Sequence, residues 1–238
     1  MVPLFDASAA TAGRVLQEHL ANFQRGDEGW RILPRPLRLQ PPSGPAYPLK
    51  KLGKGAFATA YIVDALPLVL AEVRDIGGSQ MDYSKTILAE ILRTDYTSPH
   101  LPHISYVGVT LNATLFAMPR YTVPLRAAHK IAWAQAKTLR VCLYEATNRS
   151  HKVPDSRLHG YVSRDMTLQC AAEAPLPRSL LEALTTLSDA ADNYGSQYRF
   201  EFPARNLGVD AEGNLVLLDV LYDPDALRAA QLAQRLRR

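Results

Sequence analysis

The sequence predicts an α+β fold, because a block of strand patterns precedes a block of long helical patterns. Residues 49–76 and 105–121 contain β-branched and aromatic runs separated by turn-forming residues. Residues 124–149, 178–195 and 225–238 repeat apolar side chains at helical spacing. The chain has 238 residues, a length that suits one large domain or two small ones.

The first block is expected to form a twisted antiparallel sheet with one helix, over residues 49–121. Residues 49–76 predict two strands around a glycine-rich turn and then a third strand, LVLAEVRDI. Residues 80–95 predict a helix with one apolar face. Two further strands follow over 105–121, joined at Asn112.

The second block is expected to be mainly helical. Pro124 lies near the first turn of the predicted helix 124–149, where proline is favoured. Gly195 ends the predicted helix 178–195. Residues 150–177 show no apolar period, so we expect an irregular segment between these helices.

The N-terminal residues 1–48 are predicted to form a helix and a proline-rich arm. Residues 8–25 have apolar side chains at helical spacing, with Ser8 as the cap. Residues 33–48 hold six of the 17 prolines, which predicts an extended segment with few internal hydrogen bonds. Such an arm either covers the chain's own core or docks on an acidic partner.

Composition excludes several classes of protein. No run of 18 apolar residues occurs, so no membrane span and no membrane partner are expected. Two cysteines, Cys142 and Cys170, cannot build a disulfide framework, which favours a reducing cytoplasm. The net charge is only +4, and the C-terminal arginines lack interleaved aromatic residues. Nucleic-acid binding is therefore the least favoured of the functions considered.

A glycine-rich turn, Gly53-Lys54-Gly55, lies between the first two predicted strands. Glycines in such a turn let backbone N–H groups approach phosphate oxygens without a side-chain clash. A plain glycine-rich hairpin is the alternative interpretation.

Three polar residues near the C-terminus have a spacing that indicates chemistry. Asn206 follows Glu201 by five residues, and Asp219 follows Asn206 by thirteen. A hairpin predicted between the last two brings them side by side, where an amide oxygen and a carboxylate can hold Mg²⁺. Glu201 can accept a proton from an attacking hydroxyl. The alternative is that these residues only shape a turn.

The order of these features resembles the protein kinase fold, and more narrowly the early protein kinases of T7-type bacteriophages. Residues 51–61, KLGKGAFATAY, are similar to the nucleotide-binding turn of that family, with Ala58 in place of the third glycine. Pro102-His103-Ile104 also lies at the corresponding point of the order. The resemblance implies a minimal two-lobed fold, with an N-lobe at 49–121, a reduced C-lobe at 122–238, and Mg²⁺ and ATP as cofactors.

Departures from the family pattern affect the predicted nucleotide site. Glu72 stands where the resemblance places a phosphate-binding lysine, and Leu70 where a small alanine opens the adenine slot. Glu90, the expected helix partner of that lysine, would then face another carboxylate. Arg74 or Lys54 could take the place of the missing lysine. We therefore expect ATP binding to be weak or absent.

Departures also affect the predicted catalytic loop. Glu201 replaces the catalytic aspartate, which makes it a degenerate base candidate, and Val220-Leu221 follows Asp219 instead of phenylalanine-glycine. Asn206 and Asp219 match the metal-binding positions, so weak Mg²⁺ binding remains compatible with the sequence. The pattern favours a pseudokinase.

The leading functional hypothesis is a phage early host-takeover protein. The resemblance implies that it binds a bacterial host protein, either RNA polymerase or a defence component, and inhibits or redirects it in the cytoplasm of the infected cell. The alternative is an active serine/threonine kinase that transfers the ATP γ-phosphate to host proteins, with Glu201 as base.

Overall fold

The computed structural model describes ten ranges of the chain, which divides into two compact units. The first unit contains the residues up to Ala89, then His103–Arg120 and the residues from Asp225 onward; the second contains Glu90–Pro102 and Tyr121–Pro224. The helix predicted at 8–25 lies outside the described residues. The described ranges are 31–40, 46–55, 57–64, 66–74, 84–94, 96–110, 113–123, 126–150, 163–195 and 197–235.

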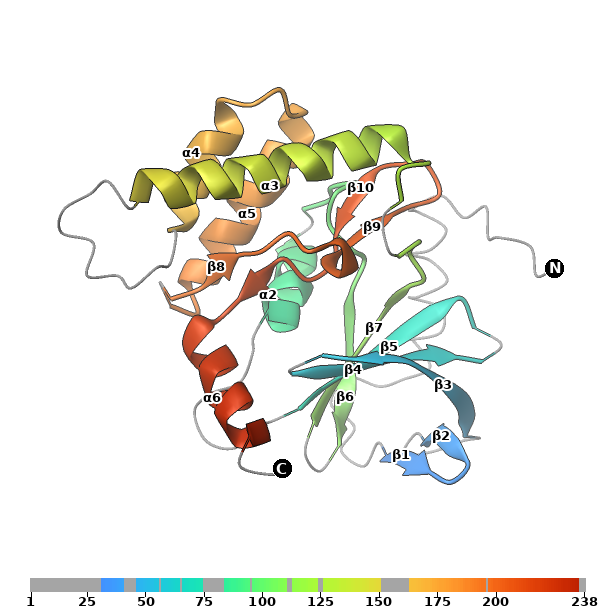
Figure 1. The fold of residues 1–238 in the computed structure, drawn as a ribbon. Helices are drawn as coiled ribbons and strands as arrows, with labels where there is room; N and C mark the ends of the chain where they lie inside the picture. The colour runs from blue at the N-terminus through green and yellow to red at the C-terminus, as the bar shows by residue number, and fades with distance from the viewer. Residues whose placement is uncertain are drawn as a thin grey trace. The chain divides into compact units, whose positions relative to one another are not determined.

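The first unit is built on a seven-stranded antiparallel sheet with the strand order β1-β2-β3-β4-β5-β7-β6 (Figure 1). Its strands are β1 (Arg31–Pro34), β2 (Leu37–Gln40), β3 (Tyr47–Lys54), β4 (Ala58–Val63), β5 (Leu68–Arg74), β6 (Ser105–Thr110) and β7 (Ala113–Pro119). The predicted α+β class and the antiparallel sheet over 49–121 are confirmed. Helix α2 (Ser84–Ile91) begins in this unit, and most of α6 (Pro224–Arg235) belongs to it.

Alternation along the strands places a hydrophobic core on one face of this sheet. Leu70 of β5 lies in that core, paired across the sheet with Tyr61 on one side and Ala117 on the other. Register shifts in β3 and β6 mark β-bulges, which let the sheet curl. The core residues are Leu39, Leu49, Tyr61, Val63, Leu68, Leu70, Val107, Leu115 and Ala117.

The proline-rich segment does not form the predicted arm over residues 31–40. Strands β1 and β2 pair as a hairpin, and β2 pairs with β3, so this part of the segment extends the sheet. Pro34 is the last residue of β1 and Pro36 lies in the turn. At these positions the missing N–H of proline removes no hydrogen bond between the strands. Leu39 is 4% exposed, which makes the hairpin part of the core.

The second unit combines three helices with two short strand pairs. Helices α4 and α5 pack against each other, and α3 packs against α4. The apolar face of α5 is buried, as the predicted helix 178–195 requires. The elements are η1 (Leu92–Thr94), α3 (Lys130–Ser150), α4 (Arg164–Ala172), α5 (Arg178–Asp192), β8 (Arg199–Phe200), η2 (Ala204–Asn206), β9 (Leu207–Val209), β10 (Leu215–Leu217) and β11 (Leu221–Tyr222).

Two helix predictions in this unit are wrong in part. Helix α3 begins at Lys130 rather than at 124, because the residues just before it form a turn. Helix α4 lies inside the segment 150–177 that was predicted to be irregular. Its buried face consists of Arg164, Thr167, Cys170 and Ala171, so it has no apolar period for the sequence to reveal.

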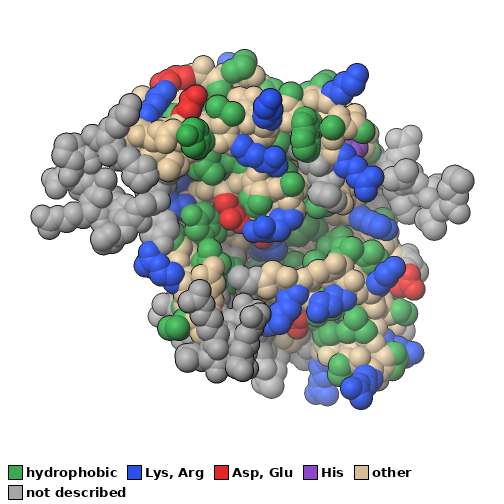
Figure 2. Space-filling view, viewed as in Figure 1, with side chains coloured by type: hydrophobic (Ala, Val, Ile, Leu, Met, Phe, Trp, Pro, Cys, Tyr) green, Lys and Arg blue, Asp and Glu red, His purple; other side chains and the backbone are tan. Residues whose placement is uncertain are grey.

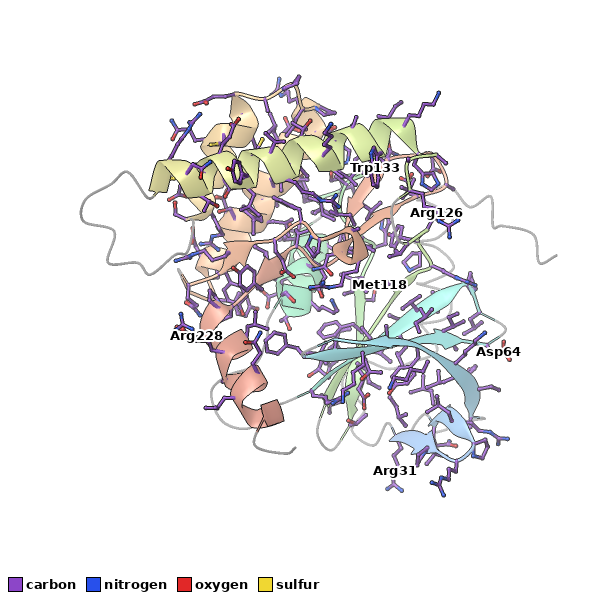
Figure 3. The ribbon with its side chains drawn as sticks, viewed as in Figure 1. Arg31, Asp64, Met118, Arg126, Trp133 and Arg228 are labelled. Carbon is purple, nitrogen blue, oxygen red and sulfur yellow. The ribbon has the colours of Figure 1, made fainter. Side chains whose placement is uncertain are left out.

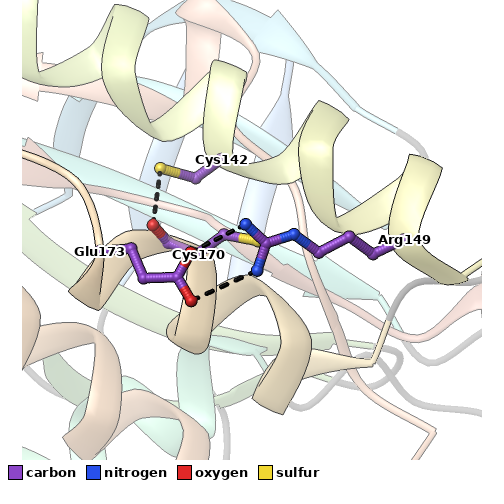
Figure 4. A network of polar contacts seen from close by, with 4 residues as sticks. All are labelled: Cys142, Arg149, Cys170 and Glu173. Carbon is purple, nitrogen blue, oxygen red and sulfur yellow. Dashed lines mark hydrogen bonds and ion pairs between the residues drawn. The ribbon is translucent and has the colours of Figure 1, made fainter.

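Polar contacts join α3 to α4 (Figure 4). The Cys142 thiol donates to the backbone oxygen of Cys170 at 3.6 Å, and Arg149 pairs with Glu173 at 2.8 Å. Burial raises the pKa of both thiols, so they stay protonated. Both cysteines are free, as expected for a chain without a disulfide framework. None of the helices in the described ranges is both long and apolar enough to cross a membrane.

Candidate functional site

The segment that carries Glu201 and Asn206 is fixed by backbone hydrogen bonds within the second unit. The N–H of Glu201 donates to the oxygen of Val220 at 2.8 Å, and the N–H of Leu218 donates to the oxygen of Asn206 at 2.9 Å. Both ends of the segment are therefore tied to the chain that flanks Asp219. This arrangement follows from the hairpin β9–β10, which the sequence predicts correctly.

The Asn206 side chain joins the three predicted site residues. Its Nδ2 donates to Glu201 Oε1 at 2.7 Å and also to the backbone oxygen of Asp219. The residue is 7% exposed, so these bonds are shielded from competing water. The structure thus brings Asn206 to the Asp219 backbone and also to the Glu201 carboxyl.

Burial raises the pKa of the Glu201 carboxyl above its ordinary value. The cation of Arg205 opposes this rise, the charge of Asp219 adds to it, and the hydrogen bond from Asn206 opposes it. A carboxyl with a raised pKa exchanges a proton more readily near neutral pH. This group is chemically suited to act as a base if a hydroxyl reaches it.

The same cluster fits a magnesium ion only in part. The Asn206 amide uses its nitrogen for the two internal hydrogen bonds, and its Oδ1 and the Asp219 carboxylate are oxygen groups of the kind that Mg²⁺ prefers. In the described ranges no three His, Cys, Asp or Glu residues are grouped closely enough to hold a metal ion. Mg²⁺ commonly takes one or two protein oxygens and completes its shell with water or phosphate.

A buried histidine that no sequence pattern indicated holds the strand that leads to Asp219. His100 Nδ1 lies 2.8 Å from the backbone oxygen of Leu215, and its Nε2 lies 3.1 Å from Ser179 Oγ. Its backbone oxygen accepts from the N–H of Leu217 at 2.9 Å. Burial lowers the pKa of His100, so the ring stays neutral and anchors β10, the strand leading to Asp219.

Helix α3 also positions the Glu201 segment. Arg140 Nε donates to the backbone oxygen of Phe202 at 2.8 Å. This partner lies 62 residues away in the chain, and the partner of His100 lies 115 residues away. No local pattern could have indicated either contact.

The glycine-rich turn lies at the end of β3 in the first unit. Gly55 N–H donates to the backbone oxygen of Ala58 at 2.7 Å, which closes the turn. A side chain at Gly53 would meet no described atom within 4 Å, and one at Gly55 would make only an ordinary contact. The described fold does not require glycine at these positions, which is compatible with a ligand approaching the backbone.

Strand β5 carries the residues that decide whether a nucleotide fits this sheet. Glu72 accepts a hydrogen bond from the Tyr61 hydroxyl at 2.8 Å. Burial, followed by this hydrogen bond and the Glu72 charge, raises the pKa of Tyr61 to about 12. Arg74, two residues along, donates to Thr59 Oγ1. Each charged group on this face of β5 therefore already has a partner within the sheet.

The β5 residues do not fit a nucleotide triphosphate. Glu72 presents a negative charge, which repels phosphate, and Leu70, only 1% exposed, lies within the core. Lys54 pairs in register with Thr59, which pairs with Glu72, so Lys54 and Glu72 share a face. The exposed Lys54 thus points to the same face of the sheet as the Glu72 carboxylate, two strands away.

The predicted site residues divide between the two units. Gly53, Lys54, Gly55, Glu72 and Arg74 belong to the first unit, and Glu90, Glu201, Asn206 and Asp219 belong to the second. Glu90 is exposed near the end of α2. Its predicted approach to Glu72 joins residues of different units and stays a prediction.

Comparison with known proteins assigns no family. No protein-family model matches the chain, and no curated protein has significant similarity to it. The function is therefore argued from the residues described above.

Proposed function

We propose that this chain is a kinase-like scaffold that has lost efficient phosphotransfer and acts by binding a bacterial host protein. The observation that carries the loss of phosphotransfer is the hydrogen bond between Tyr61 and Glu72. It holds a carboxylate at the position where the resemblance to protein kinases places a phosphate-binding lysine.

A glutamate in place of the phosphate-binding lysine weakens nucleotide binding through electrostatic repulsion. Lysine attracts a triphosphate, whereas glutamate repels it, and the interaction strengthens as water is excluded. If Glu72 turned away, the buried Tyr61 hydroxyl would lose the acceptor that lies 2.8 Å from it. Leu70 adds a steric obstacle, because its side chain is packed among Tyr61 and the other core residues.

Exposed apolar side chains on α3 support a binding role. Ile131 is 72% exposed and Tyr144 is 68% exposed, and Trp133 and Val141 lie between them in sequence on the same helix. Tyrosine and tryptophan are enriched at protein interfaces. Trp133 and Arg126 are labelled near the start of this helix in Figure 3.

The host-takeover part of the proposal rests on the resemblance to T7-type early kinases. Residues 51–61 carry that resemblance, and the described strands flank the glycine-rich turn within them. On this basis the partner is RNA polymerase or a defence component, met in the cytoplasm of the infected cell.

Capture from a bacterial lysate depleted of nucleotides tests this function. The tagged full chain is expected to retain one partner, and titration of the purified partner should give the same affinity with and without MgATP. An Ile131→Asp, Tyr144→Asp variant should lose this partner, while the exposed-site control Glu182→Gln keeps it. A partner that binds only when MgATP is present would contradict the proposal.

An active serine/threonine kinase is the second candidate. The contact between Glu201 and Asn206 favours it, because a carboxyl with a raised pKa lies beside an amide whose oxygen is of the kind that Mg²⁺ prefers. Transfer of radiolabelled phosphate from ATP to a host extract decides between the candidates. Transfer that is abolished by Glu201→Gln would establish the kinase, and no transfer above background is expected.

A further inference from the structure

We propose that the outer face of strands β1, β2 and β3 binds the phosphate backbone of double-helical nucleic acid. This inference does not depend on the proposed function. Arg31 and Leu33 of β1 pair with Gln40 and Arg38 of β2, and Arg38 pairs in turn with Pro48 of β3. Directly paired residues in an antiparallel sheet point to the same face.

Strand alternation adds a third cation to this face. Lys50 follows Pro48 by two residues and therefore points the same way, opposite to the buried Leu49. Arg31, Arg38 and Lys50 are all exposed, and Arg35 is exposed in the turn between β1 and β2. We call these four residues the hairpin cations. Figure 2 shows blue side chains gathered at the lower right, over β1 and β2.

The hairpin cations face little negative charge from their own chain segment. From Gly29 to Val63 the sequence contains six Lys or Arg residues and no Asp or Glu. Among the described residues, no ion pair involves any of these six. By contrast, Arg149, Arg164 and Arg178 of the second unit each pair with a carboxylate.

One carboxylate approaches this face. Asp64, the first acid after the stretch, donates its backbone N–H to the Pro48 oxygen at 2.9 Å, across from β3. Figure 3 labels Arg31 and Asp64, with Arg31 pointing away from the sheet. Among the described residues, four cations against one acid leave a net positive face, which is the electrostatic footprint of a polyanion site.

The character of the face favours a duplex backbone over other anions. Three of the hairpin cations are arginines, whose planar guanidinium groups match phosphate oxygens in pairs. The large apolar side chains described as exposed in this unit are Leu33, Leu52 and Leu232. None of them is aromatic, so the described residues of this face offer no exposed ring of the kind on which single-stranded bases stack.

Fluorescence anisotropy with a labelled duplex DNA of about 20 base pairs tests this inference. Each phosphate contact contributes about −0.9 to the slope of log affinity against log salt concentration. Contacts from Arg31, Arg38 and Lys50 therefore predict a slope of about −3, or a loss of about 40-fold between about 50 and about 200 mM salt. Absence of binding at the lower salt concentration would overturn the inference.

Two variants that each remove three positive charges distinguish binding by this face from an effect of the overall charge. The variant Arg31→Gln, Arg38→Gln, Lys50→Gln should bind more than tenfold more weakly at low salt, with a slope reduced by about 3. The control Arg149→Gln, Arg178→Gln, Arg228→Gln removes three exposed cations that pair with acids elsewhere. Equal losses in both variants would contradict a specific face.

A gain-of-affinity variant keeps the test informative if the triple variant does not fold. Asp64→Asn removes the acid across from β3 and should tighten binding to the same duplex, with unchanged thermal stability. A competition experiment with polyglutamate distinguishes nucleic acid from an acidic protein as the ligand. Displacement of DNA by polyglutamate at equal charge concentration would show that the face serves an acidic protein, and would overturn the nucleic-acid assignment.

Discussion

At the scale of single residues, the Tyr61–Glu72 contact makes the most specific prediction about stability. Replacing Tyr61 with Phe keeps the buried ring and removes only the hydroxyl that donates to Glu72. The half-buried carboxylate then lacks that donor, so we expect the free energy of unfolding to fall by about 1–3 kcal/mol in urea titrations at pH 7. An unchanged stability would show that the hydroxyl and Glu72 do not interact in solution.

The pH dependence of this variant tests the same contact independently. The folded chain raises the pKa of Tyr61 from 10.0 to about 12, so it favours the neutral phenol. The stability from this group is fully present below about pH 10 and is lost as the pH rises through about 12. The difference between the natural chain and Tyr61→Phe should therefore shrink over this window. A constant difference would contradict the raised pKa.

Folding also disfavours the charged form of Glu201, so its pH dependence has the same sign as that of Tyr61 but lies at acidic pH. Burial raises its pKa, so its contribution to stability is greatest at acidic pH and declines as the carboxyl ionises. Glu201→Gln keeps an acceptor for Asn206 and removes the charge. We expect this variant to melt at a higher temperature than the natural chain at pH 7, with the two curves converging below pH 4.

A surface glutamate provides the control for this measurement. Glu182 is exposed and pairs with Arg178 one helical turn away, so Glu182→Gln should change stability by less than about 0.5 kcal/mol at either pH. If Glu201→Gln destabilises the chain at pH 7 instead, the charged carboxylate is needed for the local structure.

At the scale of elements, the β1–β2 hairpin is predicted to be part of the core rather than a mobile arm. Leu39 is 4% exposed within the core cluster, so Leu39→Ala should lower the free energy of unfolding by about 2–4 kcal/mol. Leu33 lies on the opposite face of the hairpin and is exposed, and Leu33→Ala should cost less than about 0.5 kcal/mol. Equal small effects would mean that the hairpin detaches in solution.

The elements also show what a sequence can and cannot reveal. Strands β3 to β7 and helix α5 follow from alternation and helical periodicity, because each buries an apolar face. Helix α4 buries Arg164 and Thr167 with small residues, so periodicity gives no signal. The β1–β2 hairpin was missed because proline density outweighed a strand pattern of only four residues on each side.

The candidate site also contains some contacts that the sequence predicts and others that it does not. Sequence spacing and one hairpin were enough to bring Asn206 and Asp219 together, and the structure adds Glu201 to them. The Tyr61–Glu72 bond and the anchoring of β10 by His100 depend on which strands and helices become neighbours. That information is absent from any local pattern.

At the scale of the whole molecule, the chain enters each of its two units more than once. The first unit is completed by His103–Arg120 and by the residues from Asp225 onward, so neither unit is a continuous stretch of sequence. The glycine-rich turn with Glu72 belongs to one unit, and Glu201 with Asn206 belongs to the other. A kinase-like function would require both sets, and a defect in either set suffices to abolish it.

Titration calorimetry of the full chain with MgATP tests the central claim most directly. We predict no saturable binding at nucleotide concentrations up to about 1 mM, because in the proposed kinase-like arrangement Glu72 would repel phosphate and Leu70 would occupy the adenine position. A Leu70→Ala, Glu72→Lys variant, which introduces the residue types of the kinases that the chain resembles, is the matched comparison, and any nucleotide binding should appear there alone. Saturable binding of MgATP to the natural chain with a Kd of a few micromolar would contradict the account.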